Sequence, residues 1–490
     1  MSAVKKSLFG SLLLVSESIT KKLIGLVSTL ILARVLVPED FGLVAIATLT
    51  LGFLDVLANT GSKQYLLRID KIDSDIINTS WTIDFILRAI MAILLFAFTP
   101  LLAEYYDDER LEMILYVMAS LIIVGQIRNP GLIYLIRQQN YAPTVKLSIL
   151  TKFIAVGVAI AIALIYESYW ALILGTYASV LMGSLGSFVI HPYRPKFCLK
   201  NAKEQWKFSS WLLPQSIIGF GRTQLDTIMV SAAADKSALG FYHIMKYIAF
   251  IPSSHLLLPA TQPLLVQLAK TKHTKSHFSH QYNITFIATM LLTLPMTSLL
   301  FFYSELFVAV LLGEKWVNYA ELFAAFSLLI PAFAILNQAR RVLLVFGKTK
   351  HMFYYELVSF TVLYGTLFQI GISDLIRFSY IRVLMENGLC ILFMLYITAQ
   401  YTSAQNMLRL CLATAPIIVS CLISYLVTDL FPLTAIPLID VALVTVIFSA
   451  VFCIVLTGLY YSFLKNIKEW QFIEGLVRKS VVFFYQKVVG

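Results

Sequence analysis

The chain has 490 residues, of which 59% are hydrophobic and 13% are charged, and its formal net charge is +11. Soluble domains carry about 25% charged residues, so the composition excludes an ordinary soluble protein. The basic residues lie in short connections between apolar segments and not on a separate domain, so membrane topology explains the positive charge better than nucleic-acid binding does.

Apolar segments long enough to cross a hydrocarbon core recur along the whole chain. The first segment runs to about Val37 without a small-residue cleavage site, which favours a transmembrane helix over a signal peptide. We predict an all-α integral membrane protein with about 14 transmembrane helices. The predicted helices begin near residues 9, 41, 79, 111, 145, 169, 209, 238, 282, 319, 353, 375, 408 and 437.

The distribution of Lys and Arg residues orients these helices. Most of the 38 basic residues fall in segments on one side, and only Arg110, Lys236 and Lys315 fall in the opposite loops. The positive-inside rule therefore predicts cytoplasmic N- and C-termini. Residues 465–490 mix basic and aromatic side chains, which predicts an amphipathic tail on the cytoplasmic leaflet.

A weak internal repeat divides the predicted helices into two lobes. The turn Phe41-Gly42-Leu43 is matched 198 residues later by Leu239-Gly240-Phe241, and the same offset relates Gln64 to Gln262. Parallel repeats of this kind are typical of transporters. We predict an N-lobe at 1–190 (helices 1–6), a cytoplasmic linker at 191–208, a C-lobe at 209–400 (helices 7–12) and two further helices at 401–464, with a central pathway built mainly from helices 1, 2, 7 and 8.

Charged residues inside the predicted helices are the main functional signal, because each costs about 2.5–3.5 kcal/mol at a helix centre unless it has a partner or a wet cavity. Several opposite charges are separated by four residues, which places both members on one helical face. The pairs are Glu17 with Lys21 in helix 1, Asp84 with Arg88 in helix 3, Arg222 with Asp226 in helix 7, and Arg382 with Glu386 in helix 12. Mutual neutralisation explains the pairs of helices 3 and 12 well. For the pairs of helices 1 and 7 we favour a functional role.

Helices 1, 2, 7 and 8 hold further charges without an evident partner, namely Lys22, Lys246 and Asp55. A wet cavity with this cationic excess would attract an anion, and a pyrophosphate is the natural candidate. The expected substrate-binding residues are Lys21, Lys22, Arg222 and Lys246. The candidates for coupling to protons or sodium are Glu17, Asp55 and Asp226. The secondary candidates are Arg88, Arg128, Arg382 and Glu386, and Arg128 beside Asn129-Pro130 either lines the cavity or caps a kink.

Neither metal nor catalytic sites are predicted. The five Cys residues form no CxxC pair. His273, His277 and His280 have metal-ligand spacing, but their basic surroundings favour contact with lipid headgroups. The sequence contains no P-loop, GxSxG or HExxH motif, so we expect no enzyme and no cofactor.

The segment Ala33-Arg34-Val-Leu-Val-Pro38-Glu39-Asp40-Phe41-Gly42 resembles the ARxLGPxDFG signature of polysaccharide-exporting flippases, with Val37 in place of the usual Gly. The segment from Asp226 to Tyr242 is similar to that family's pattern of an Asp followed by a GxY turn. This resemblance to the Wzx-type, polysaccharide-transporter branch of the multidrug/oligosaccharidyl-lipid/polysaccharide (MOP) exporter superfamily spans nearly the whole chain.

The resemblance implies a MATE- and MurJ-like fold of two six-helix lobes plus two C-terminal helices. It also implies that the protein moves undecaprenyl-pyrophosphate-linked oligosaccharide repeat units across a bacterial inner membrane by alternating access, for O-antigen, capsule or exopolysaccharide synthesis. The expected partners are the lipid-linked oligosaccharide, membrane lipids, and the polymerase and export machinery of the same pathway. No nucleic acid is expected, and a monomer could suffice.

Three alternatives remain open. A MATE-type drug or cation antiporter would need an acidic cavity, which the cationic excess disfavours. A lipid II flippase is not separated from the favoured interpretation by the sequence. A membrane polymerase or ligase of polysaccharide would carry a large outer loop, whereas the longest predicted outer loop, Ser304 to Asn318, is short.

Overall fold

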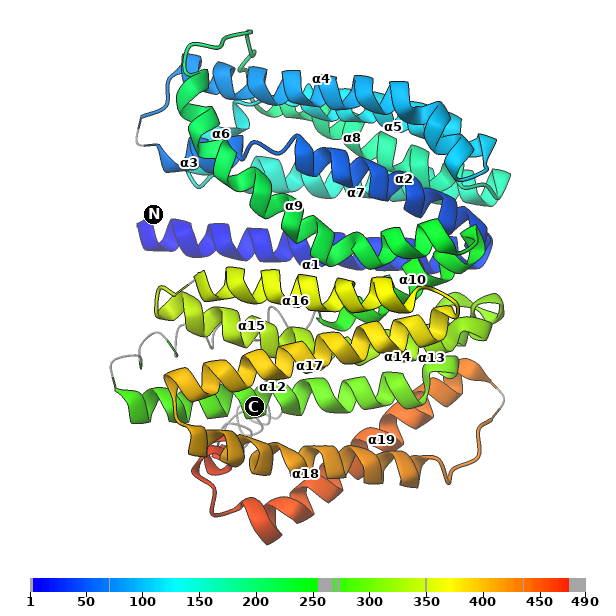
Figure 1. Ribbon diagram of the computed structural model, residues 1–490, viewed down its shortest axis with the longest axis vertical. Helices are drawn as coiled ribbons and strands as arrows, with labels where there is room; N and C mark the ends of the chain where they lie inside the picture. The colour runs from blue at the N-terminus through cyan, green and yellow to red at the C-terminus, as the bar shows by residue number, and fades with distance from the viewer. Residues whose placement is uncertain are drawn as a thin grey trace, which may run out of the picture. The chain divides into compact units, whose positions relative to one another are not determined.

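A computed structural model describes residues 3–69, 71–253, 268, 271, 274–348, 350–434 and 436–475. These residues form helices and connecting loops, with no strand among them (Figure 1). The chain divides into two compact units, Met1–His243 and Ile244–Gly490. The repeat partner Gln262, His273 and the predicted tail beyond residue 475 lie outside the described residues.

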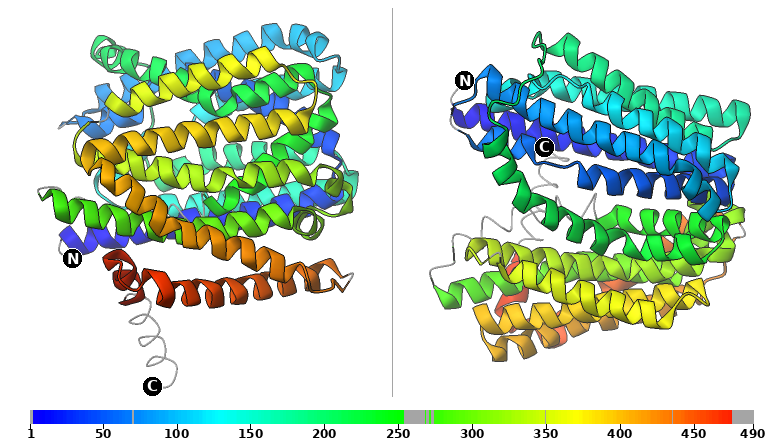
Figure 2. Two further views of the ribbon diagram at one scale, coloured as in Figure 1. Left: turned by 60° about the horizontal axis from the view of Figure 1, so that its bottom comes forward. Right: turned by 45° about the horizontal axis from the view of Figure 1, so that its top comes forward.

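The first unit is a bundle in which α1 packs along α7, α7 along α8, and α4 along α5. Helix α9 packs along α2 and also contacts α3 and α4, and it bends where Pro214 interrupts its backbone hydrogen bonding (Figures 1 and 2). The helices of this unit are α1 (Ala3–Val35), α2 (Pro38–Leu57), α3 (Ser62–Arg68), α4 (Ser74–Tyr105), α5 (Glu109–Gln126), α6 (Leu132–Arg137), α7 (Ala142–Tyr166), α8 (Trp170–Ile190), α9 (Ala202–Ala233) and the start of α10 (Lys236–Pro252).

The second unit has a core of aromatic and aliphatic side chains from α12, α15, α17 and α18, including Phe278, Tyr282 and Phe393. Helix α12 packs along α18 and α15, and α18 packs along α19. The helices are α12 (Lys275–Phe302), α13 (Ser304–Leu312), the 3₁₀ segment η2 (Glu314–Tyr319), α14 (Ala320–Ser327), α15 (Leu329–Val345), α16 (Lys350–Ile370), α17 (Leu375–Tyr401), α18 (Ala404–Thr428), α19 (Pro437–Leu459) and the π segment η3 (Tyr460–Leu464).

The helices are those of a multi-pass membrane protein. Among the described residues, nine helical stretches are long and apolar enough to cross a membrane. Only 17% of the apolar window of α4 is buried inside the protein, which leaves most of this helix available to lipid. Helices α1 and α9 have 33 and 32 residues but are not among the nine, and they carry the charges Glu17, Lys21 and Arg222. The all-α membrane fold is confirmed, and the number of 14 crossings stays a prediction.

Two predicted helices are broken within the first unit. The second one is interrupted between α2 and α3, where Gly61 adopts a φ of 67°, a left-handed conformation that favours glycine. The fourth is interrupted between α5 and α6 at Asn129-Pro130, since proline cannot continue the hydrogen-bond ladder. In membrane proteins, non-helical backbone is tolerated where it lines a water-filled cavity. These two breaks therefore indicate where a polar cavity lies.

The starts of α2 and α10 cross at two glycines, and we call the segments Pro38–Gly42 and Lys236–Gly240 the α2–α10 crossing. A Cβ atom added to Gly42 would lie 1.8 Å from the carbonyl oxygen of Lys236, and one added to Gly240 would lie 1.8 Å from that of Pro38. The 198-residue offset of the predicted repeat relates Gly42 to Gly240 and Pro38 to Lys236. The crossing therefore brings into contact the two segments that the sequence repeat matches.

Candidate functional site

The first unit contains a polar cavity of about 690 Å³. Its walls come from α1, α3, α4, α6 and α7, and from the break between α5 and α6. Residues 128–130 of the break between α5 and α6 line the cavity, and α3, which follows the other break, lines it too. This is expected for irregular backbone at membrane depth. The charged side chains that line it are Glu17, Lys21, Lys63, Asp84 and Arg128.

Helix α1 contributes an ion pair to this cavity. Lys21 Nζ lies 3.4 Å from Glu17 Oε1 and donates a 2.8 Å hydrogen bond to Ser148 Oγ on α7. The predicted pairing of Glu17 with Lys21 across one helical turn is confirmed. The Lys21 side chain remains 40% exposed, so its ammonium group is accessible to a ligand in the cavity.

The break between α5 and α6 places Arg128 in the cavity wall. The adjacent Asn129 holds the break: its Oδ1 accepts a 2.8 Å hydrogen bond from the Gly131 backbone N–H, and its Nδ2 donates a 2.7 Å bond to the His191 carbonyl. Of the two interpretations of Arg128, the structure therefore supports lining of the cavity, because Asn129 satisfies the interrupted backbone. The Arg128 side chain is exposed, and its planar guanidinium offers up to five hydrogen-bond donors.

Asp84 on α4 is held by a buried polar network. Its Oδ1 accepts hydrogen bonds from the hydroxyls of Thr60 and Ser62, the latter at 2.8 Å. Gln205 on α9 is fully buried, accepts from Ser80 Oγ at 2.7 Å and donates to Ser62 Oγ at 2.6 Å. The network joins α3, α4 and α9 at the wall of the cavity, where Ser62, Ser80 and Asp84 line it, and holds the start of α3 in place.

Asp55 and Arg88 form an ion pair between helices. Arg88 Nη1 lies 2.6 Å from Asp55 Oδ1, which joins α4 to α2. This corrects the expectation that Asp55 stands alone. It also shows that the ion-pair partner of Arg88 is Asp55 and not Asp84, because Asp84 is turned toward the start of α3. Helical spacing identifies which face a charge occupies, but not which neighbouring helix approaches it.

The remaining predicted site residues do not line this cavity. Asp226 on α9 is fully buried and accepts a 2.8 Å hydrogen bond from Tyr242 Oη, so the Asp and the Tyr of the family-like pattern contact each other. Lys22 on α1, Arg222 on α9 and Lys246 on α10 are half-buried. Arg382 and Glu386 lie buried in α17, each 3% exposed.

No role was predicted for two residues that line the cavity, Lys63 and Asn129, or for Gln205 in the network beside it. None of the three has charge-pair spacing, and Gln205 lies within the segment predicted as a linker, 191–208. The available signals were the Gly61 and Asn129-Pro130 breakers, which mark helix interruptions. Among the described residues, no group of three or more His, Cys, Asp or Glu side chains is placed to hold a metal ion.

The connection between α4 and α5 forms a charged cluster beside the α2–α10 crossing. Asp108 accepts hydrogen bonds from Arg110 Nη2 at 2.8 Å and lies 2.9 Å from Lys236 Nζ, and Arg110 also binds Glu39. Burial acts to raise the pKa of Asp108, but the hydrogen bonds from Arg110 and Lys236 outweigh it and lower that pKa to about 2. The ionised carboxylate therefore ties α5 to α10.

Asp108→Asn is expected to lower stability by on the order of 2 kcal/mol at neutral pH. A carboxyl whose pKa is depressed in the folded state stabilises the fold above its ordinary pKa near 3.8, and this contribution is lost as pH falls toward 2. The difference in unfolding temperature between wild type and variant, measured against pH in detergent, should thus shrink between pH 4 and 2. Asp107→Asn is the control, since Asp107 is exposed. Equal effects of both changes at every pH would contradict the pairing.

The chain resembles known families over most of its length. A family described as "Polysaccharide biosynthesis protein" matches residues 31–321. The succinoglycan biosynthesis transport protein ExoT of Rhizobium meliloti is 24% identical over 58% of this chain and 58% of its own length. The lipopolysaccharide biosynthesis protein WzxC of Escherichia coli is 21% identical over 60% of each chain. The teichuronic acid biosynthesis protein TuaB of Bacillus subtilis is 21% identical over 62% of this chain and 64% of its own length. Each match thus spans less than two thirds of the relative.

Solved structures show the same fold. The lipid II flippase MurJ, in an inward closed conformation, superposes with a TM-score of 0.71 at 14% identity, over 92% of this chain and 99% of that one. An inward-facing multidrug resistance MATE family transporter of the MOP superfamily gives a TM-score of 0.59 at 11% identity, over 82% of this chain and 99% of that one. The predicted MATE- and MurJ-like fold class is confirmed.

Proposed function

Because this chain belongs to the polysaccharide biosynthesis protein family, we propose that it is a flippase for lipid-linked oligosaccharides. The substrate is an undecaprenyl-pyrophosphate-linked repeat unit, moved from the cytoplasmic to the periplasmic leaflet of a bacterial inner membrane by alternating access. The transport and biosynthesis functions in the names of ExoT and WzxC support this proposal. In this account the protein is a transporter and not an enzyme, and both termini are cytoplasmic.

The cationic cavity of the first unit is the observation that carries the proposal. Lys21, Lys63 and Arg128 line it against Glu17 and Asp84, and Glu17 is already paired with Lys21. Ammonium and guanidinium groups make charge-assisted bonds to phosphate oxygens, and these bonds are strong where water is scarce. A pyrophosphate with sugars attached fits a wet polar cavity, while the polyprenyl chain stays in lipid.

The remaining candidates take roles within the same proposal. Lys22, Arg222 and Lys246 would extend the cationic surface that the substrate meets as access alternates. Protonation or sodium binding at Glu17, Asp55 or Asp226 would couple transport to an ion gradient. Asp55 and Asp226 also hold parts of the fold together, Asp55 through its ion pair with Arg88 and Asp226 through the hydrogen bond from Tyr242. The polymerase and export machinery of the pathway would receive the flipped unit.

Deletion of the gene in its native host tests the proposed function. The expected result is loss of surface polysaccharide together with accumulation of the lipid-linked repeat unit, both reversed by the wild-type gene. Growth with a panel of cationic drugs serves as the second readout, because a MATE-type exporter would protect against them. If surface polysaccharide is unchanged and drug sensitivity increases, the flippase proposal is wrong and the protein is a drug exporter.

A further inference from the structure

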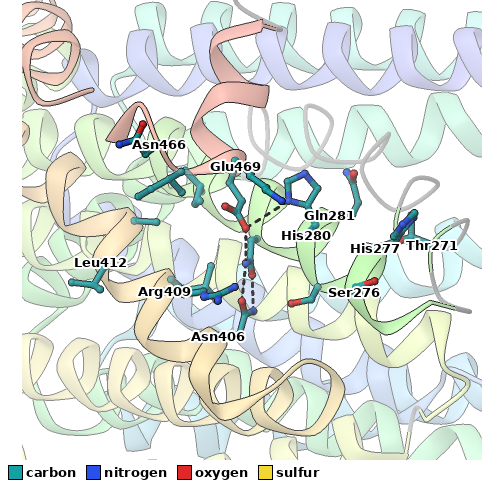
Figure 3. A pocket seen from close by; sticks show the side chains of 17 residues that line it. Thr271, Ser276, His277, His280, Gln281, Asn406, Arg409, Leu412, Asn466 and Glu469 are labelled. Carbon is teal, nitrogen blue, oxygen red and sulfur yellow. Dashed lines mark hydrogen bonds and ion pairs between the residues drawn. The ribbon is translucent and has the colours of Figure 1, made fainter. Parts of the chain in front are cut away.

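A second polar cavity, of about 890 Å³, lies at one end of the second unit (Figure 3). Its walls come from the first turns of α12, from the first turns of α18, and from residues 466–469 at the start of a helical C-terminal segment, residues 468–475. Figure 3 shows Ser276 and His280 on α12, Asn406 and Arg409 on α18, and Glu469 on the C-terminal segment around the same space.

Hydrogen bonds join the three elements that form the walls of this cavity. Asn283 and Asn406 exchange two amide hydrogen bonds of 2.8 and 2.7 Å, and both side chains are buried. Trp470 is 4% exposed, and its indole N–H donates to the carbonyl of Ala413 on α18 at 3.2 Å. The C-terminal segment is thus anchored on α18, where it forms one wall of the cavity.

The electrostatics of the cavity favour an anion. Its basic lining residues are His277, His280, Arg409 and Lys468, and its acidic lining residue in the described part of the chain is Glu469. The Glu469 carboxylate is already engaged, since Asn283 Nδ2 donates to it at 3.1 Å and His280 Nδ1 lies 3.6 Å away. Arg409 and Lys468 form no ion pair with any described residue, and both are exposed.

Helix ends and hydroxyl groups add to this preference. The positive ends of the α12 and α18 dipoles face the same end of the unit, because both helices begin there. The hydroxyls of Ser276 and Ser279 offer further donors. Guanidinium, ammonium, hydroxyl and helix N-terminus together form a donor set suited to phosphate oxygens.

The position of the cavity favours a lipid over a soluble phosphate. Leu412 lines it and is 60% exposed, and Leu408, one helical turn earlier on α18, is 66% exposed. These leucines lie on a long apolar helix that crosses the membrane, so the exposed apolar surface continues from the cavity into lipid. A phosphate in the cavity would leave room for acyl chains along this face.

We propose that this cavity binds the phosphate headgroup of an anionic membrane phospholipid, with Arg409 and Lys468 as its principal ligands and the acyl chains along Leu408 and Leu412. The site is separate from the cavity of the first unit. A bound lipid would join α12, α18 and the C-terminal segment at the membrane surface.

Binding of a fluorescent short-chain phosphatidylglycerol to the full-length protein in detergent tests the proposal. Arg409→Gln with Lys468→Gln should weaken binding roughly tenfold or more, because two charge-assisted bonds are lost. Lys348→Gln with Lys465→Gln is the matched control, since both lysines are exposed, lie in the same unit and do not line the cavity. This control should bind as the wild type does, and phosphatidylcholine should compete poorly.

Two results would overturn the proposal. Equal affinity of the cavity variant and the control variant would show that the lipid binds elsewhere. Displacement of the fluorescent lipid by submillimolar inorganic phosphate would assign the cavity to a soluble phosphate compound. Elution of all variants as the same monodisperse species in size-exclusion chromatography excludes misfolding as the cause of weaker binding.

Discussion

Gly240→Ala is expected to destabilise the protein at the upper end of the roughly 1–3 kcal/mol typical of overpacking, or beyond it. The new methyl carbon would lie 1.8 Å from the carbonyl oxygen of Pro38 and 2.7 Å from its carbonyl carbon. Both atoms belong to backbone at the start of α2, so neither can rotate away as a side chain would. The α2–α10 crossing must therefore separate, and the Asp108–Lys236 ion pair beside it is strained as well.

The unfolding temperature in detergent measures this effect. Gly42→Ala should act alike, since its methyl carbon would lie 1.8 Å from the Lys236 carbonyl oxygen. Gly157→Ala on α7 is the control, because a Cβ there meets nothing within 4 Å and alanine favours helix. The control should be neutral or slightly stabilising. If Gly240→Ala has the same unfolding temperature as the control, the two backbones are not in close contact at the α2–α10 crossing.

Loss of transport is the expected result of removing the cavity cations. Lys21→Ala and Arg128→Ala should each reduce surface polysaccharide roughly tenfold or more in a complemented deletion strain, since a hydrogen bond to a charged group contributes about 1.5–3 kcal/mol. Arg128→Lys should retain part of the activity, because it keeps the charge and loses the fork of donors. The combined Lys21→Ala and Arg128→Ala variant should be inactive.

Matched controls separate binding from folding in this experiment. Lys203→Ala removes an exposed cation at the start of α9 that does not line the cavity. It should complement fully, and all variants should reach the membrane in equal amounts by immunoblot. If both cavity variants are fully active at normal membrane levels, the cavity of the first unit does not bind the transported substrate.

The fold class could be predicted from the sequence because the membrane imposes a simple rule. Long apolar segments with intrasegment hydrogen bonding are required wherever lipid is the solvent, and residues such as Pro38 and Pro437 mark where helices begin. The repeat offset, which rests on Gly42 and Gly240, also has a physical cause, since these glycines are where two backbones touch. Asn129-Pro130 indicated a kink at the end of the fourth predicted helix, whereas the interruption at Gly61 was not predicted.

Partner choice could not be predicted from helical spacing. A separation of four residues on one helical face correctly pairs Glu17 with Lys21, whereas Arg88 forms its ion pair with Asp55 on another helix. Long side chains select partners by helix packing, and packing depends on contacts far apart in the chain. The Gln205 network could not be predicted for the same reason, because the neutral Gln205 side chain joins three helices only once they are packed together. For the second polar cavity, the sequence contained one indication, namely the basic surroundings of His277 and His280, which favoured contact with lipid headgroups.

The central claim is that this protein moves a lipid-linked oligosaccharide from one leaflet to the other. The leaflet on which the accumulated repeat unit resides in the deletion strain tests it most directly, measured by labelling its sugars enzymatically in right-side-out and inside-out membrane vesicles. We expect label only in inside-out vesicles from the deletion strain, and label in both vesicle types after complementation. Equal labelling of both vesicle types from the deletion strain would mean that the unit crosses without this protein, and the flippase proposal would be wrong.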